Sequence, residues 1–138
     1  MTAVLALAAL LFLSVASAQQ AESASNELAS IPESDVAYPY RLTPTTNIWT
    51  QILLDTATGR VWQVQYSIDE TPAGRVALNE SSLLPEGAAP KNGRFAVSPT
   101  QNMYTFLLID REDGRIWQLQ WSNDPDNRGI IRSIPLAR

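Results

Sequence analysis

Acidic side chains are the residues of this sequence from which a catalytic site could be built. The chain has no cysteine and no histidine, which excludes Ser-His-Asp and Cys-His sites, histidine-ligated metals, thiolate clusters and disulfides. Glycoside hydrolysis needs only two carboxylates, but they must face each other across a cleft. Most of the acids fall in predicted turns, so we expect no enzyme and no catalytic residue, and a carboxylate-dependent hydrolase is the second alternative. The acids considered are Asp69, Glu70, Asp110, Glu112, Asp113, Asp124 and Asp126.

Two D-x-x-x-G-R strings look like half of an acidic calcium-binding loop. They run from Asp55 to Arg60 and from Asp110 to Arg115. Turn chemistry explains them better, because Asp bonds its own turn backbone, Gly accepts a positive φ, and an Asp–Arg pair can close the mouth of a hairpin. The first string also has threonines where calcium would require acids. We therefore expect no metal site and no cofactor.

Polar side chains near the predicted strands are the candidates for a binding surface. Glutamines recur at alternate positions, which makes them either the solvated face of a one-sided sheet or a surface that hydrogen-bonds sugar hydroxyls or a peptide backbone. A P-T-x-N loop precedes each glutamine-bearing hairpin. Pro and Asn explain these loops as turns, and the functional alternative places both on one rim that grips a partner. The candidate binding residues are Gln51, Gln63, Gln65, Gln118, Gln120, Asn47 and Asn102.

An internal repeat organises the part of the sequence that carries these residues. Residues 40–67 align with residues 95–122 at an offset of 55, with twelve of 28 positions identical and no gap. A repeat of this period predicts one supersecondary unit used twice. The departure of most interest is Gln51, because Phe106 occupies the same place in the second copy.

Each copy is predicted to be a set of antiparallel strands. Short β-branched and aromatic runs alternate with Pro, Gly, Asn and Asp, and no period of 3.6 is sustained. A four-residue turn at 56–59 places Leu53 opposite Trp62. The expected strands are 39–43, 48–55, 60–67 and 75–79, with counterparts at 94–98, 103–110, 115–122 and 130–134.

Alternation at period two divides each predicted hairpin into two faces. The face that holds the tryptophans is expected to form the core in both copies, with the two such faces turned toward each other, because tryptophan is the largest apolar side chain available. The residues of this face are Trp49, Gln51, Leu53, Trp62, Val64 and Tyr66, and then Tyr104, Phe106, Leu108, Trp117, Leu119 and Trp121.

The N-terminal 37 residues are predicted to lie outside the folded domain. Residues 1–18 hold an uncharged apolar run that is too short to span about 30 Å of hydrocarbon, and they end in Ala-Ser-Ala, which is typical of a signal peptide. A retained anchor is the alternative, because no Lys or Arg precedes the run. Residues 19–37 have the acidic composition of a disordered leader. The β domain is expected at 38–138, with repeat one at 38–82, a linker at 83–93 and repeat two at 94–138.

Two resemblances bear on the fold. The strings PTTNIWTQILLDTATGRVWQVQYS and PTQNMYTFLLIDREDGRIWQLQWS resemble units of short exported bacterial tandem-repeat proteins of unassigned function, over residues 40–67 and 95–122. The segment 54–62 is more loosely similar to the blades of quinoprotein-type β-propellers. That similarity implies blade-like hairpins and nothing about a quinone cofactor, and two blades would need partner subunits or a different closure.

The sequence therefore predicts an all-β protein. Two pseudo-repeated antiparallel units of three or four strands are expected to pack as a small sandwich or distorted barrel, after a signal peptide and a disordered leader. Ten bases against fourteen acids make nucleic acid an unexpected partner. No stable membrane span is expected after cleavage, and open edge strands would permit homo-oligomerisation by strand addition.

The expected function is binding rather than catalysis. We expect a secreted or periplasmic protein that recognises a protein or glycan partner in the periplasm or cell envelope. The alternative is a structural component of an envelope or surface assembly.

Overall fold

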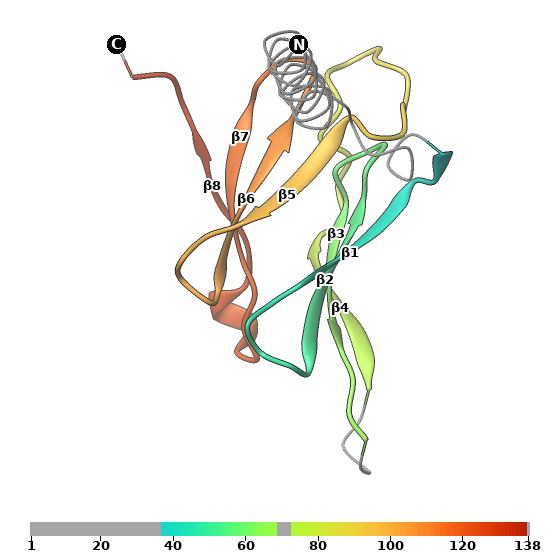
Figure 1. Cartoon of the computed structure of the whole chain (residues 1–138). Helices are drawn as coiled ribbons and strands as arrows, with labels where there is room; N and C mark the ends of the chain where they lie inside the picture. Colours follow the sequence, from blue (N-terminus) through green and yellow to red (C-terminus); the bar gives the residue numbers. More distant parts are fainter. Residues whose placement is uncertain (1–36, 69–72, 138) are drawn as a thin grey trace, which may run out of the picture. The chain divides into compact units, whose positions relative to one another are not determined.

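The fold is all-β, as predicted. The structure is a computed structural model that describes residues 37–68 and 73–137. In these residues eight strands form two antiparallel four-stranded sheets arranged as a sandwich (Figure 1). The predicted signal peptide at 1–18 and, except for Ala37, the predicted leader at 19–37 lie outside the described residues. No helix in the described ranges has both the length and the hydropathy needed to cross a membrane.

The two sheets have the same topology, because each is a simple meander of four consecutive strands. The first sheet consists of β1 (Tyr40–Pro44), β2 (Thr50–Asp55), β3 (Val61–Gln65) and β4 (Gly74–Asn79). The second sheet consists of β5 (Phe95–Pro99), β6 (Thr105–Asp110), β7 (Ile116–Gln120) and β8 (Gly129–Ile134), with the short 3-10 helix η1 (Pro125–Asn127) before β8.

The predicted register of the central hairpin is confirmed. Leu53 lies opposite Trp62 in β2 and β3, and Leu108 lies opposite Trp117 in β6 and β7. The turns end with a glycine in the left-handed region, since φ is +77° at Gly59 and +75° at Gly114. Residues with a Cβ rarely adopt this conformation, which explains the glycines. The strands are one or two residues shorter than expected at several ends.

The outermost strands of both sheets are irregular. Pro44 ends β1 and Pro99 ends β5. The pairing of β3 with β4 shifts register at Leu78, and that of β7 with β8 shifts at Ile131, so each of these edge strands carries one extra residue.

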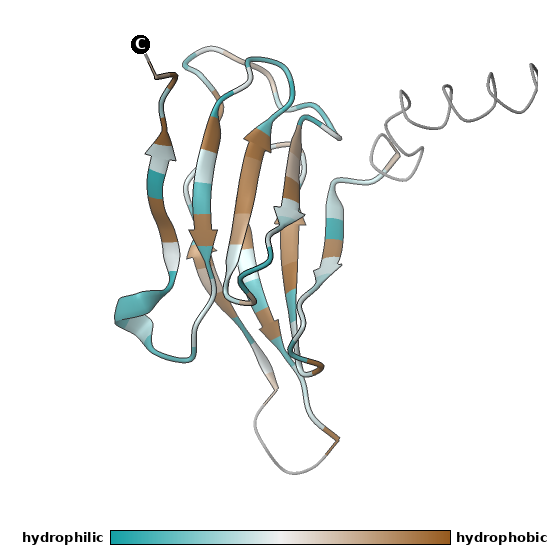
Figure 2. Cartoon of the chain, turned by 60° about the vertical axis from the view of Figure 1, so that its left-hand side comes forward, coloured by the Kyte–Doolittle hydropathy of each residue, from teal (hydrophilic) through white to brown (hydrophobic). Residues whose placement is uncertain are grey.

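One hydrophobic core lies between the sheets, where β2 faces β5 and β4 faces β8. Figure 2 shows β6 hydrophobic along almost its whole length. The buried hydrophobic residues of the first sheet are Ile52, Leu54, Val61 and Leu78, and those of the second sheet and the residue after β7 are Phe95, Phe106, Leu108, Trp117, Leu119 and Trp121.

The predicted core face is correct for the second repeat and wrong for the first. The second sheet buries the face that holds Phe106, Leu108 and Trp117. The first sheet instead buries the opposite face, so Trp62 is half-buried and Trp49 is 36% exposed. The two sheets therefore stack in the same orientation. The tryptophan-bearing face of the second sheet packs on the face of the first sheet that is opposite its own tryptophans, so the tryptophan-bearing faces do not turn toward each other. This face of the first sheet can form a core because it carries the apolar side chains of Ile52, Leu54 and Val61.

The chain between β4 and β5 is fastened to the turn between β2 and β3. The hydroxyl of Thr56 donates to the carbonyl of Pro39 (2.8 Å) and accepts from the backbone N–H of Gly93 (3.0 Å). The carbonyl of Thr56 accepts from the N–H of Phe95 (2.8 Å). This buried threonine therefore positions the first strand of the second sheet against the first sheet.

Candidate functional site

The P-T-x-N loop between β1 and β2 is shaped by its own side chains. The Thr45 hydroxyl lies 2.9 Å from the carbonyl oxygen of Thr50 and 3.0 Å from that of Asn47. The side-chain oxygen of Asn47 accepts from the backbone N–H of Trp49 at 2.9 Å. Such side-chain to backbone bonds are the turn chemistry expected of Thr and Asn.

The loop between β5 and β6 repeats this arrangement. The Thr100 hydroxyl lies 2.8 Å from the carbonyl oxygen of Thr105, and the side-chain oxygen of Asn102 accepts from the N–H of Tyr104 at 2.9 Å. The two loops therefore have the same internal hydrogen bonds, which fix the position of both asparagines.

The two loops line one hollow, although 55 residues separate them in the chain. Its volume is about 270 Å³. Three threonines, Asn102 and the buried Phe106 are among the residues that line it. No charged side chain among the described residues lines it. The lining residues are Pro44, Thr45, Thr46, Pro99, Thr100, Asn102, Met103 and Phe106.

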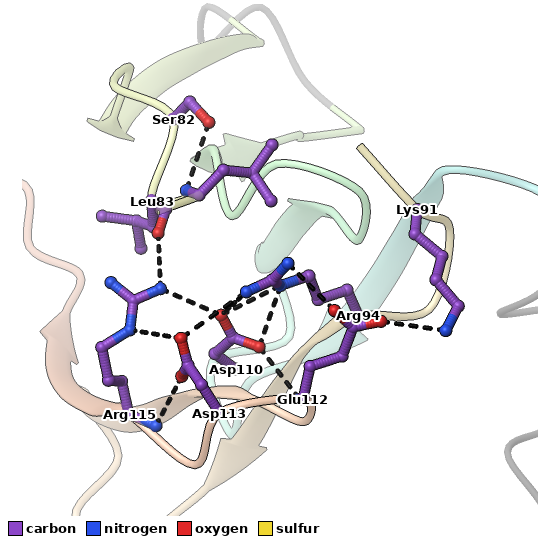
Figure 3. Close-up of polar contacts among 9 residues, drawn as sticks. Ser82, Leu83, Lys91, Arg94, Asp110, Glu112, Asp113 and Arg115 are labelled. Atoms are coloured by element: carbon purple, nitrogen blue, oxygen red, sulfur yellow. Dashed lines mark hydrogen bonds and ion pairs between the residues drawn. The ribbon is translucent and has the colours of Figure 1, made fainter. Parts of the chain in front are cut away.

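A charged cluster occupies the turn between β6 and β7 (Figure 3). Arg94 donates from Nε to both carboxylate oxygens of Asp110 at 3.0 Å, and its Nη2 lies 2.8 Å from Oδ2. Arg115 adds a contact of 3.0 Å to Asp110, and donates to Asp113 at 2.7 Å. Glu112 accepts from Lys91 at 2.9 Å and lies 3.0 Å from Arg94. Arginine is suited to such bidentate pairing with carboxylates.

The ionisation of Asp110 is fixed by these partners. Burial by itself raises the pKa of Asp110, but hydrogen bonds from Arg94 and from the turn backbone, together with the Arg94 charge, outweigh it, so the pKa is lowered. The hydrogen bond to Asp110 in turn raises the pKa of Arg94. A general acid for glycoside hydrolysis needs the opposite shift. The cluster is thus a clamp between the linker and the hairpin.

The corresponding turn of the first sheet has no such cluster. The carboxylate of Asp55 accepts from the N–H of Ala57 (3.0 Å) and from the hydroxyl of Thr58 (2.6 Å). The predicted Asp–Arg pair at the hairpin mouth is therefore present at Asp110 and Arg115, whereas Asp55 is satisfied by its own turn.

The structure distributes the glutamine candidates over three surfaces. Gln63 is buried between the sheets, where its amide accepts from the N–H of Ser122 at 3.3 Å. Gln118 and Gln120 lie on the outer face of the second sheet, where Gln118 accepts from Arg132 and Gln120 donates to the carbonyl of Asn127. Gln51 lies on the outer face of the first sheet, and Gln65 shares the face of Gln63.

Of the predicted binding residues, Asn102 lines the hollow and Asn47 fixes the loop beside it. Two features were missed. The first is that Thr46 and Met103 also line the hollow. The only sequence signal for them is that they lie within or next to the two matched P-T-x-N motifs. Arg94 is the main partner of Asp110, but Pro39 is its counterpart in the first repeat, so the repeat could not identify it.

Comparison with known protein families, with curated proteins and with solved structures gives no match for this chain.

Proposed function

We propose that this chain is an exported, non-enzymatic binding protein that recognises a protein or glycan partner in the periplasm or cell envelope through the hollow between the P-T-x-N loops. The observation that carries the proposal is the convergence of two loops of matched sequence on one hollow. Structural turns alone do not require the two loops to meet.

The chemistry of the hollow favours an uncharged group. The hydroxyl protons of Thr45 and Thr100 are donated within the loops, so the Thr46 hydroxyl and the side-chain NH2 of Asn102 are the groups that can donate to sugar hydroxyls or to a peptide backbone. The apolar ring of Phe106 suits a sugar ring or an apolar side chain. A volume of about 270 Å³ lies just below the usual range for sites that enclose a small molecule, which is roughly 300–1,000 Å³. The partner is therefore expected to insert one group and to remain largely outside.

The absence of catalysis is part of the proposal. Asp110, Glu112 and Asp113 are all paired with basic side chains. Asp124 is used at η1, where it accepts from the N–H of Asp126 at 3.0 Å. Carboxylates engaged in this way are poorly placed to transfer protons to a substrate.

A matched pair of tryptophan substitutions tests the hollow. Thr46 and Gln101 occupy the same position in the two loops and both are exposed, but only Thr46 lines the hollow. Thr46→Trp should fill it and reduce binding at least tenfold, whereas Gln101→Trp should bind like the parent protein. The measurement is binding to a glycan array and, in parallel, to envelope proteins of the native host, at a concentration where light scattering gives the monomer mass.

Equal binding by both variants, or loss of binding in both, would show that the hollow is not the site. Detection of no partner with either probe would remove the binding function itself.

A further inference from the structure

The outer face of the first sheet is uncovered among the described residues, although it has the composition of a core. It is the face on which tryptophans and aliphatic residues alternate. Leu42 is 53% exposed and Tyr40 is 60% exposed, whereas isolated exposed residues, not contiguous apolar faces, are the normal case. On β1 to β3 and the residues next to them the face consists of Tyr40, Leu42, Trp49, Gln51, Leu53, Trp62, Val64 and Tyr66, and β4 adds Arg75 and Ala77.

Six of the eight residues on β1 to β3 and next to them have a buried counterpart in the second sheet, while Val97, the counterpart of Leu42, is partly buried and Tyr104, the counterpart of Trp49, is 45% exposed. At the offset of 55 the counterparts of Leu53 and Trp62 are Leu108 and Trp117, which are buried against the first sheet. The two faces also share local geometry. Trp49 packs edge-on against Tyr66 at 5.9 Å between ring centroids, and their counterparts Tyr104 and Trp121 lie 5.1 Å apart.

Equivalent hydrogen bonds support the same correspondence. The hydroxyl of Tyr66 donates to the carbonyl of Ile48, and the indole N–H of Trp121 donates to the carbonyl of Met103. Ile48 and Met103 are also 55 positions apart. The uncovered face therefore has one aromatic pair and one hydrogen bond in common with the covered face.

The outer face of the second sheet has the complementary property. It corresponds to the back of the first sheet, which is buried inside the molecule. The pairs are Thr105 with Thr50, Leu107 with Ile52, Ile109 with Leu54, Ile116 with Val61, Gln118 with Gln63 and Gln120 with Gln65. Every pair is identical or conservative, yet all six residues on the second sheet remain partly accessible. A hollow of about 350 Å³ is lined by Ile116 and Ile134 of this face together with Trp117 and Ser133 of the inner face.

Four glycines distinguish positions that pack against the other sheet from positions that do not. A Cβ at Gly59 would lie 3.1 Å from the ring of Phe95, and one at Gly129 would lie 3.2 Å from the carbonyl of Leu78. At the counterparts, Gly114 and Gly74, nothing lies within 4 Å. The positions that the internal stacking fills at Gly59 and Gly129 are thus open at their counterparts.

We propose that a second copy of this chain covers each outer face, so that the outer face of the first sheet of one copy stacks on the outer face of the second sheet of the next. Such a contact is head-to-tail and repeats the packing found between the two sheets of one chain. Head-to-tail contacts produce a closed ring when the rotation between copies closes and a filament when it does not. Gln51 and Arg75 replace Phe106 and Ile130 of the internal contact, so the contact between copies is weaker than the internal one.

Two charge substitutions test the arrangement. Leu42→Glu places a charge on the outer face of the first sheet, and Leu107→Glu places one on the outer face of the second. We expect the full parent chain to increase in mass with concentration across the micromolar range, in light scattering and sedimentation. Each variant alone should remain monomeric, because every contact needs both faces.

A mixture of the two variants gives the decisive result. It retains one intact face from each, so it should form a one-to-one pair that does not grow further. Formation of this pair also shows that both variants are folded. Leu136→Glu, at an apolar residue that is 93% exposed beyond β8, is the control and should assemble like the parent chain.

Three results would overturn the proposal. A parent chain that is monomeric at every concentration would show that the outer faces do not bind copies, which includes the case where residues 1–36 occupy the outer face of the first sheet. Self-association of Leu107→Glu alone would indicate a symmetric contact through the first sheet. A mixture that contains only monomers would show that the two faces do not recognise each other.

Discussion

Asp55 and Asp110 occupy the same position in the two repeats and are satisfied in different ways. Asp55 accepts from its own turn, whereas Asp110 is buried and depends on Arg94 and Arg115. A buried carboxylate must be paired, because desolvation disfavours the charged form. The difference arises from the residue before the first strand of each sheet, which is Pro39 in one and Arg94 in the other.

Asp110→Asn should lower the free energy of unfolding by about 2 kcal/mol at neutral pH. This loss is smaller than that expected on breaking a fully desolvated ion pair, because the neighbouring Glu112 and Arg115 are solvent-accessible. The pKa of Asp110 is lower in the folded state, so its contribution is complete above the ordinary value and is lost as the pH falls below about 4. Urea unfolding should therefore show that the free energy of unfolding falls less between pH 7 and pH 3 in the variant than in the parent protein.

The control for this experiment is Asp113→Asn, since Asp113 pairs with Arg115 at the surface. Surface pairs contribute little, so its effect should stay below about 1 kcal/mol. If the free energy of unfolding fell equally between pH 7 and pH 3 in the parent and Asp110→Asn chains, Asp110 would not contribute to the loss of stability in acid.

At the scale of the elements, the two hairpin turns share one conformation and differ in what surrounds them. Gly59 and Gly114 have nearly the same φ. Leu83 and Phe95 crowd Gly59, whereas the space around Gly114 is open. The pair therefore separates the cost of backbone conformation from the cost of packing.

Gly114→Ala should destabilise by about 1–2 kcal/mol, the cost of placing an alanine in the left-handed region. Gly59→Ala should cost a further 1–3 kcal/mol or so, because its methyl group enters a packed contact. Thermal and urea unfolding of the two variants measure the difference. Equal losses would mean that the contact of Gly59 with Phe95 is loose.

The elements could largely be predicted from the sequence. Turn residues and alternation fix the pairing of Leu53 with Trp62, because both strands leave the same four-residue turn. Alternation shows which residues share a face, but it does not show which face is covered. In the first repeat both faces are apolar near the turn, with Leu53 and Trp62 on one and Ile52 and Val61 on the other, so the stacking of the sheets decides.

The candidate site was predictable only in part, for the same reason. The matched motifs predicted two loops of one shape, and the hydrogen bonds of Thr45 and Thr100 agree with that prediction. The clamp could not be predicted, because Arg94 and Asp110 meet only through the pairing of β5 with β6, which places Phe95 opposite Asp110. A contact of this kind depends on the register of strands outside the hairpin.

At the scale of the whole molecule, one leucine occurs at the same position of both repeats in different surroundings. Leu108 is buried between the sheets, and Leu53 lies half-buried on the outer face of the first sheet. Leu108→Ala should cost about 2–5 kcal/mol, because it leaves a cavity. Leu53→Ala should cost less than about 1.5 kcal/mol in the monomer, because Leu53 is partly exposed and its removal leaves no enclosed cavity. Urea unfolding at low protein concentration makes the comparison, and equal losses would contradict the same-orientation stacking.

The irregular edge strands restrict how this protein can associate. Pro44 and Pro99 leave no backbone donor at the ends of β1 and β5, and the extra residues at Leu78 and Ile131 distort β4 and β8. Proline and bulges at sheet edges oppose the backbone pairing through which amyloid-like ribbons extend. Lateral growth of either sheet is thereby discouraged, and the direction that remains open is perpendicular to the planes of the sheets, through the side chains of the two broad surfaces.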